Sequence, residues 1–257
     1  MNQSSPSAQS VFADQVSSRL ARLAEVVATG GLDPAVETLV TAIRAGGVIQ
    51  AFGTGHSEAF AMEIAGRAGG LIPAHRIALR NVVLRGSRVV DDLVGADLER
   101  DGTVVPELLD LTNLDPADVF IIASNSGVNS SIVGMALAAK ERGHQVIAVT
   151  SLAHTNAVAP KHPSGKRLAE VADVVIDNLA PYGDATVTIG DGDAAVTVGA
   201  VSSITAAYIA QALTIGVVTR LLDDGEAPPV YISANVPGGD EHNDALTARY
   251  GGRIQSL

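Results

Sequence analysis

The 257-residue sequence predicts an α/β fold in which a flavodoxin-like, doubly wound parallel sheet has helices on both faces. Short runs rich in Val, Ile and Ala alternate along the chain with longer, helix-like segments. Parallel strands that are buried on both faces have this near-continuous apolar character. In addition, the runs at 47–52 and 119–123 are each followed at once by a Gly- and Ser-bearing loop. Ligands of such sheets lie at the carboxyl ends of the strands, which is where we expect both loops.

We predict a single domain over 1–257, which begins with N-terminal helices in 10–46. Thr29-Gly30-Gly31 separates two helices, and the second has Asp33 as its N-cap and Pro34 in its first turn. The core sheet occupies 47–178. Its strands are predicted at 47–52, 119–123, 145–150 and 172–177, with a further strand at 77–84.

Three segments follow the predicted sheet. Residues 181–198 are rich in Gly and Asp and predict a hairpin around 190–193. A stretch without charge, 198–219, is long enough to cross a bilayer. Its Ala, Ser, Thr, Gly and Gln content instead favours a long helix over 198–222, buried in the core or in a subunit interface. The polar tail at 228–257 forms either a lid or an exposed terminus.

Composition excludes several classes of function. The net charge of −11 argues against nucleic acid and membrane as partners, because a negative protein repels polyanions. The chain has no Cys, which excludes disulfides, zinc–thiolate sites and thiol nucleophiles and favours a cytoplasmic location. Residues 1–10 are polar and predict no signal peptide. No His-Glu-x-x-His motif or calcium loop occurs, so neither a metal nor a cofactor is expected.

The first loop predicts an anion site, and it consists of Gly53, Thr54, Gly55, His56 and Ser57. Its glycines allow a sharp turn or a close approach to a ligand, and its polar side chains lie beside the free N–H groups of the next helix. An ordinary turn capped by Ser57 would use the same residues. A dinucleotide loop is not indicated, because the third glycine of its motif is missing and no acidic residue follows about 20 residues later.

The second loop strengthens the prediction of an anion ligand. It contains Ser124, Asn125, Ser126, Gly127, Asn129, Ser130 and Ser131. One helix cap would need only one of these hydroxyl and amide groups. An excess of donors at a helix N-terminus matches a phosphate, which has several anionic oxygens.

With both loops identified, the sequence resembles the sugar isomerase (SIS) family. Members typically have a first loop of the form G-x-G-x-S and a second of the form S-x-S-G followed by Ser or Thr. Here these are Gly53-Thr54-Gly55-His56-Ser57 and Ser124-Asn125-Ser126-Gly127. The resemblance is close over 47–177 and looser over the N-terminal helices and the long helix. The run 124–143 is similar to the arabinose phosphate isomerase branch without a gap.

The resemblance implies a phosphorylated sugar as ligand. It also implies a homo-oligomer, a dimer or a tetramer, with sites often completed by a neighbouring subunit. The family's phosphate-contacting positions fall on Ser124, Asn125, Ser126 and Asn129 of the second loop, with Ser57 from the first. Asn129 stands where the family usually has Ser or Thr, which makes Ser130 the candidate for that contact.

Sugar-phosphate isomerisation needs a base that moves a proton between adjacent carbons. Glu63 is the first candidate, since it lies six residues after Ser57, or about 9 Å along a helix. The alternative is an i,i+4 ion pair with Arg67. His56 is a further candidate, within the first loop itself. The alternative is that His56 is an unpaired polar loop residue without a functional role.

The tail supplies two further catalytic candidates, Glu241 and His242. Glucosamine phosphate synthases, which share the fold, also place a functional histidine in a C-terminal segment. For His242, the alternative is an exposed tail residue without a function. His75 ranks behind Glu63 and His242, and the basic loop at 162–167 is interpreted as a solvated turn.

The leading hypothesis is therefore a sugar-phosphate isomerase that works through an enediol, with Glu63 as base and His242 or His56 in ring opening or proton relay. A phosphosugar-binding regulatory module is the second, although the chain lacks a basic domain for DNA. Etherase or deaminase chemistry on an amino-sugar phosphate is the third.

Overall fold

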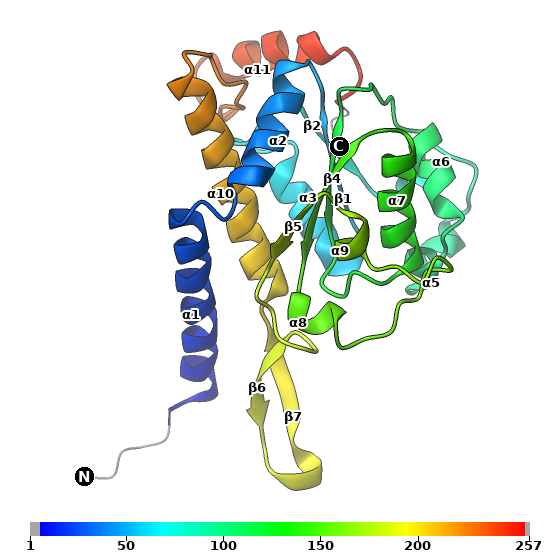
Figure 1. Ribbon diagram of the computed structural model, residues 1–257, viewed down its shortest axis with the longest axis vertical. Coiled ribbons are helices and arrows are strands. Elements are labelled where there is room, and N and C mark those ends of the chain that lie inside the picture. The colour runs from blue at the N-terminus through cyan, green and yellow to red at the C-terminus, as the bar shows by residue number, and fades with distance from the viewer. Residues whose placement is uncertain (1–5, 255–257) are drawn as a thin grey trace.

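A computed structural model describes residues 6–254 and contains a five-stranded sheet in the order β2-β1-β3-β4-β5 (Figure 1). The strands are β1 (Ile49–Gly53), β2 (Ala74–Ile77), β3 (Val119–Ala123), β4 (Gln145–Thr150) and β5 (Val174–Asp177). All neighbouring strands pair in parallel. This is the doubly wound, flavodoxin-like order, so the predicted fold class is confirmed.

Helices cover both faces of the sheet because side chains alternate along each strand. Ile49 and Ala51 face one hydrophobic core, and Phe52 faces the other. The first core packs against α1 (Ala8–Ala28), α2 (Asp33–Arg44), α3 (Glu58–Ile64) and α10 (Ser202–Asp223). The second packs against α4 (Asn81–Leu84), α5 (Asp97–Arg100), α6 (Val104–Asp110), α7 (Ser130–Glu141) and α9 (Leu168–Val171).

Two element predictions were wrong in detail. The strand predicted at 77–84 lies at 74–77, and the chain then turns into α4, where the N–H of Asn81 donates to the carbonyl of Ala78. Helix α2 begins at Asp33 itself, with Leu32 rather than Asp33 in the cap position. The predicted hairpin is confirmed as β6 (Ala185–Ile189) and β7 (Val196–Ala200), joined by the turn at Gly192–Ala194.

The long apolar helix, α10, starts at Ser202 rather than at 198 because 196–200 forms β7. It meets the length and hydropathy of a membrane span. Helices in protein cores meet the same test, and α10 packs here against α1, α2 and α3. One face of the helix stays exposed in a single chain and includes Ile204 and Ile215.

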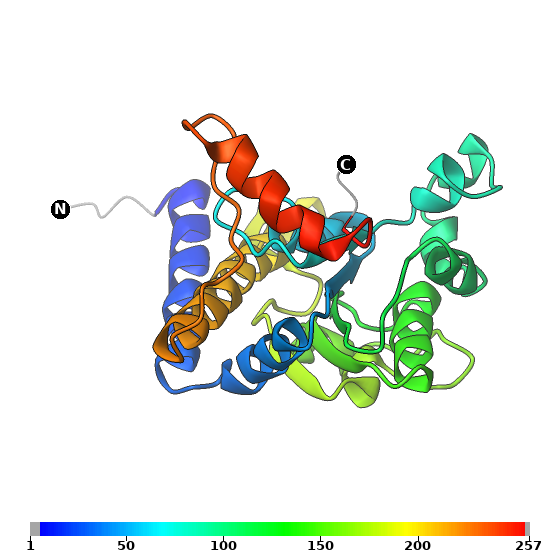
Figure 2. The same cartoon turned by 90° about the horizontal axis from the view of Figure 1, so that it is seen from above.

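The tail, as far as Ile254, lies at the amino ends of the strands. The N–H of Gly69 donates to Tyr231, and Arg253 donates to the carbonyl of Gly46, both just before strands begin. Helix α11 (Gly239–Thr247) is accordingly at the opposite end of the molecule from the β6–β7 hairpin (Figure 1), and it faces the viewer in Figure 2. Within one chain the described part of the tail, 228–254, does not cover the two loops.

Candidate functional site

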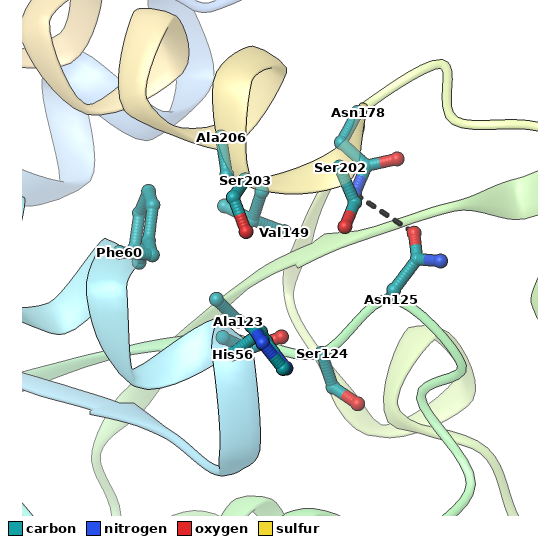
Figure 3. Close-up of a pocket in the computed structure, with 11 residues that line it drawn as sticks. His56, Phe60, Ala123, Ser124, Asn125, Val149, Asn178, Ser202, Ser203 and Ala206 are labelled. Atoms are coloured by element: carbon teal, nitrogen blue, oxygen red, sulfur yellow. Dashed lines mark hydrogen bonds between the residues drawn. The ribbon is translucent and has the colours of Figure 1, made fainter. Parts of the chain in front are cut away.

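A cavity of about 380 Å³ opens at the carboxyl ends of β1 and β3, where the two loops meet. Gly53 and Ala123 end these strands side by side in the sheet, which brings the loops together. The cavity is lined by Thr54, Gly55, His56, Ser57, Glu99, Ser124, Asn125, Ser126, His154, Asp184, Ala200, Ser202 and Ser203. Its inner end, drawn in Figure 3, continues to Phe60, Asn178 and Ala206.

The first loop is held by close backbone packing rather than by its side chains. A Cβ at Gly53 would lie 2.3 Å from the carbonyl oxygen of Ser57, so only glycine fits this turn. Residues Gly55–Ser57 form a single 3-10 turn before α3. Ser57 is the N-cap residue of α3 but makes no side-chain capping bond. Its hydroxyl is therefore available to a ligand.

The second loop is held from within by Ser124, whose Oγ accepts from the N–H of Gly127 at 3.1 Å. Gly127 has φ +63°, and a Cβ there would lie 3.0 Å from Oγ1 of Thr150. The side chain of Asn125 accepts from Asn178 at 3.2 Å (Figure 3). Ser126 has no hydrogen-bond partner among residues 6–254, which leaves its hydroxyl at the cavity unused by the fold.

Glu99, from α5, occupies the space between the loops. Its carboxylate accepts a hydrogen bond from the side-chain amide of Asn129, and its carbonyl accepts from Ser131 at 2.5 Å. A Cβ at Gly55 would lie 3.0 Å from the other carboxylate oxygen. A negative group thus already lies against residues of both loops.

The segment that carries Glu99 is tied down by Arg88, which pairs with Asp101 at 2.9 Å and with Glu107 of α6 at 2.6 Å. The Thr103 hydroxyl and then Arg88 hold the pKa of the Asp101 carboxyl below its usual range. Hydrogen bonds from Arg88 likewise lower the pKa of Glu107. Both carboxylates therefore stay charged near neutral pH. Their ion pairs with Arg88 hold α5 in place in the pH range in which the site would operate.

The third wall of the cavity is the start of α10, where Ser202 and Ser203 lie opposite His56 and Ser124 (Figure 3). Asp184 accepts from the N–H groups of Val201 and Ser202 at 3.1 and 2.8 Å, and from the Ser202 hydroxyl at 2.6 Å. Its φ of 69° lies in the left-handed region, which Asp tolerates better than most residues. This carboxylate occupies the N-terminus of α10 and gives this wall a negative charge.

His154, from α8 (Leu152–Thr155), is held in one orientation beside the cavity. Its Nδ1 accepts from the N–H of Gly183 at 2.9 Å, and its ring stacks on Tyr182 with centroids 5.2 Å apart. Since Nδ1 is an acceptor, the proton of the neutral imidazole lies on Nε2. His154 therefore presents a hydrogen-bond donor rather than a base.

The structure separates the predicted site residues into two groups. Residues 54–57 and 124–126 line the cavity, whereas Gly53, Gly127 and Asn129 do not. Ser130 instead approaches the carbonyl of Lys161 at 3.4 Å. Glu63 pairs with Arg67, as its alternative interpretation predicted, and also accepts from Gln211 at 2.9 Å. Gln211 is five residues after Ala206, which lines the inner end of the cavity, so the Gln211 contact places Glu63 about 7.5 Å beyond that end along α10.

The tail candidates also lie outside the cavity. His242 approaches the carbonyl of Val230 at 3.0 Å, and Glu241 lies beside it on α11. His75 is buried near the start of the sheet and bonds to Gln50 at 2.8 Å. Within residues 6–254, none of these side chains reaches the two loops.

Sequence reasoning missed six polar residues that line the cavity: Glu99, His154, Asn178, Asp184, Ser202 and Ser203. The Ser202-Ser203 pair at the start of an uncharged helix was the one local signal for them. Among the described residues, no group of three or more His, Cys, Asp or Glu is placed to hold a metal ion.

Comparison with known proteins places the chain in a family. The SIS domain matches residues 11–151. A UPF0309 protein of Geobacillus thermodenitrificans is 36% identical over 226 residues, or 88% of each chain. One from Listeria monocytogenes is 37% identical over 223 residues, which cover 87% of this chain and 89% of the relative. A phosphoheptose isomerase structure from Neisseria gonorrhoeae covers 83% of this chain and 100% of its own, with a TM-score of 0.50 and 18% identity, and supports the fold. The chain belongs to the SIS domain family.

Proposed function

We propose that this chain binds a phosphorylated sugar in the cavity between its two loops and α10. The observation that carries the proposal is the pair of hydroxyls, on Ser57 and Ser126, that face the cavity without serving the fold. The second loop runs into the N-terminus of α7 at Ser130, where a helix has free N–H groups and a positive dipole end. The membership of the SIS family supports a phosphosugar over other anions.

The charges of the cavity orient the ligand. Asp184 would repel a phosphate at the α10 wall, but it can accept hydrogen bonds from sugar hydroxyls. Ser202 and Ser203 add hydroxyls on the same side. We therefore place the phosphate on the two loops and the sugar against α10.

Glu99 competes with the phosphate for the same loops and must move when the ligand binds. The change Glu99→Gln removes this negative charge and is expected to tighten phosphosugar binding by about 1–2 kcal/mol, or about five- to thirtyfold. Isothermal titration with the best-binding sugar phosphate measures the effect. Glu141→Gln, an equal charge change at the far end of α7, is the control. Unchanged or weaker binding in Glu99→Gln would show that Glu99 does not compete.

We further propose that the bound sugar phosphate is isomerised between its aldose and ketose forms. The imidazole of His56 has no hydrogen-bond partner among residues 6–254 and is free to take a proton from the sugar. His154, with its proton on Nε2, can donate to the carbonyl oxygen on which negative charge develops as the carbon-bound proton leaves, which gives the neutral enediol. His56 and His154 both line this cavity, so a sugar bound there can meet the base and the donor together.

A panel of pentose, hexose, heptose and amino-sugar phosphates tests the proposed function. Binding is measured by thermal shift and turnover by resolving aldose from ketose. Stabilisation together with turnover of at least one sugar phosphate is the expected result. Binding without turnover would leave a binding module as the function, and no binding at all would overturn the proposal.

The identity of the base is tested by two matched variants. His56→Gln is expected to lower kcat by about a hundredfold with little change in KM, because the phosphate contacts remain. Glu63→Gln should stay active, since Glu63 bonds to Arg67 and Gln211 outside the cavity.

Loss of turnover in Glu63→Gln would contradict this assignment and favour Glu63 as base. Mixing that variant with an inactive Ser126→Asp chain then distinguishes a base from the same subunit from a base supplied by a neighbouring subunit. Restored turnover in the mixture would place Glu63 in a site shared between subunits.

A further inference from the structure

A second cavity, of about 750 Å³, lies along the outer side of the edge strand β2, away from the two loops. Helix α3, helix α4 and the tail form its walls. Four arginines line it: Arg67, Arg76, Arg80 and Arg85. We call this cavity the arginine groove.

The positive charge of the groove is only partly neutralised. Arg67 pairs with Glu63, while Arg76 and Arg80 share the single carboxylate of Glu58, at 3.7 and 2.6 Å. Arg85 is exposed and has no ion-pair partner among residues 6–254. Four guanidinium groups thus face two carboxylates, in a chain whose net charge is −11.

Arg76 is the least solvated of the four. Its side chain is 11% exposed, and burial lowers the pKa of its guanidinium. A partly buried cation is unfavourable unless an anion pairs with it at close range. Glu58 does not provide that, because it is already engaged with Arg80 at the shorter distance. A further anion at Arg76 would relieve this imbalance.

We propose that the arginine groove binds a small phosphorylated molecule with an apolar or ring-shaped body, at a site separate from the sugar cavity. Guanidinium groups hold phosphate oxygens in bidentate pairs. Met62 and Leu84, which are exposed apolar residues, and Tyr231 line the same groove and offer contacts to the rest of the molecule. The volume lies within the range of small-molecule sites, about 300–1,000 Å³.

The groove also has a direct connection to the first loop. Glu58, which Arg76 and Arg80 share, follows Ser57 in sequence and begins α3. A phosphate that binds these arginines competes with Glu58 for them. Occupation of the groove would thereby change the contacts of the residue next to Ser57.

Charged side chains on an edge strand have another known use, which is to prevent pairing with a second sheet. In that case the arginines would serve as a barrier and no ligand would bind. The two explanations differ in whether the groove has affinity for phosphate, which can be measured directly.

The test uses inorganic pyrophosphate as the probe and isothermal titration of the full chain at about physiological ionic strength. The background variant is Ser124→Ala/Ser126→Ala, in which the predicted phosphate loops are weakened. Pyrophosphate is expected to bind this variant with one site per chain. Adding Arg76→Gln and Arg85→Gln to it should weaken that binding by at least about tenfold.

Arg85→Gln alone covers the case in which Arg76→Gln does not fold, because Arg85 is exposed. The charge-matched control is Arg22→Gln/Arg142→Gln, which removes two exposed arginines from α1 and the end of α7 and should leave binding unchanged. No binding to the background variant, or equal loss in the control, would overturn the proposal. Neither result bears on the sugar cavity, which is tested separately.

Discussion

Replacing Asp118 with Ala is expected to lower the free energy of unfolding by about 3–5 kcal/mol. The side chain of Asp118 is 0% exposed and forms an ion pair with Arg253 of the tail. It also accepts hydrogen bonds from the N–H of Val48 at 2.8 Å, the Gln50 amide at 2.9 Å and the N–H of Asp115 at 3.1 Å. One carboxylate thus joins the start of β1, the turn before β3 and the tail. Alanine would leave these donors buried without an acceptor.

Urea unfolding of three variants checks this expectation. Arg253→Ala should cost less than Asp118→Ala, because Asp118 keeps its three other donors. Glu37→Ala removes a pair with Arg220 in which both side chains are 44% exposed, and it should cost at most about 1 kcal/mol. If Asp118→Ala were as mild as Glu37→Ala, the buried carboxylate would not hold the tail to the sheet.

The central strands could be predicted from sequence because burial on both faces leaves a clear pattern. Residues 119–123 are all buried, and every one is apolar. Strand β2 has a different character, since it lies at the edge of the sheet and contains His75 and Arg76. His75 is buried there through its bond to Gln50 of β1, a partner 25 residues away that no local pattern shows. The predicted strand was therefore displaced toward the apolar residues after Ile77.

The two loops could be predicted because each is a continuous segment with its own chemistry. The rest of the polar lining comes from separate segments that the topology of the sheet brings together: Glu99, His154, Asn178, Asp184 and the start of α10. Helical geometry predicted the distance from Ser57 to Glu63, but it did not predict the direction in which the helix runs from the loop. A helix that follows a parallel strand runs back toward the amino ends of the sheet, so α3 leads Glu63 away from the loops.

Ser126→Asp is expected to weaken phosphosugar binding by at least about a thousandfold. Loss of one hydrogen bond to a charged group costs about 1.5–3 kcal/mol. A carboxylate about 4 Å from the phosphate adds a repulsion of about 4 kcal/mol near a protein surface. The fold should tolerate the change, because the Ser126 hydroxyl has no partner within residues 6–254 and an acidic residue suits the start of α7.

Two further variants show whether the effect belongs to the ligand. Ser126→Ala should weaken binding by about ten- to a hundredfold without repulsion, and its melting temperature should match that of the parent chain. Ser130→Ala is the matched control from the same loop, since the Ser130 hydroxyl approaches Lys161 and does not line the cavity. Equal losses in Ser126→Ala and Ser130→Ala would mean that the phosphate lies nearer the start of α7 than the cavity indicates. Unchanged affinity in Ser126→Asp would remove the second loop from the binding site altogether.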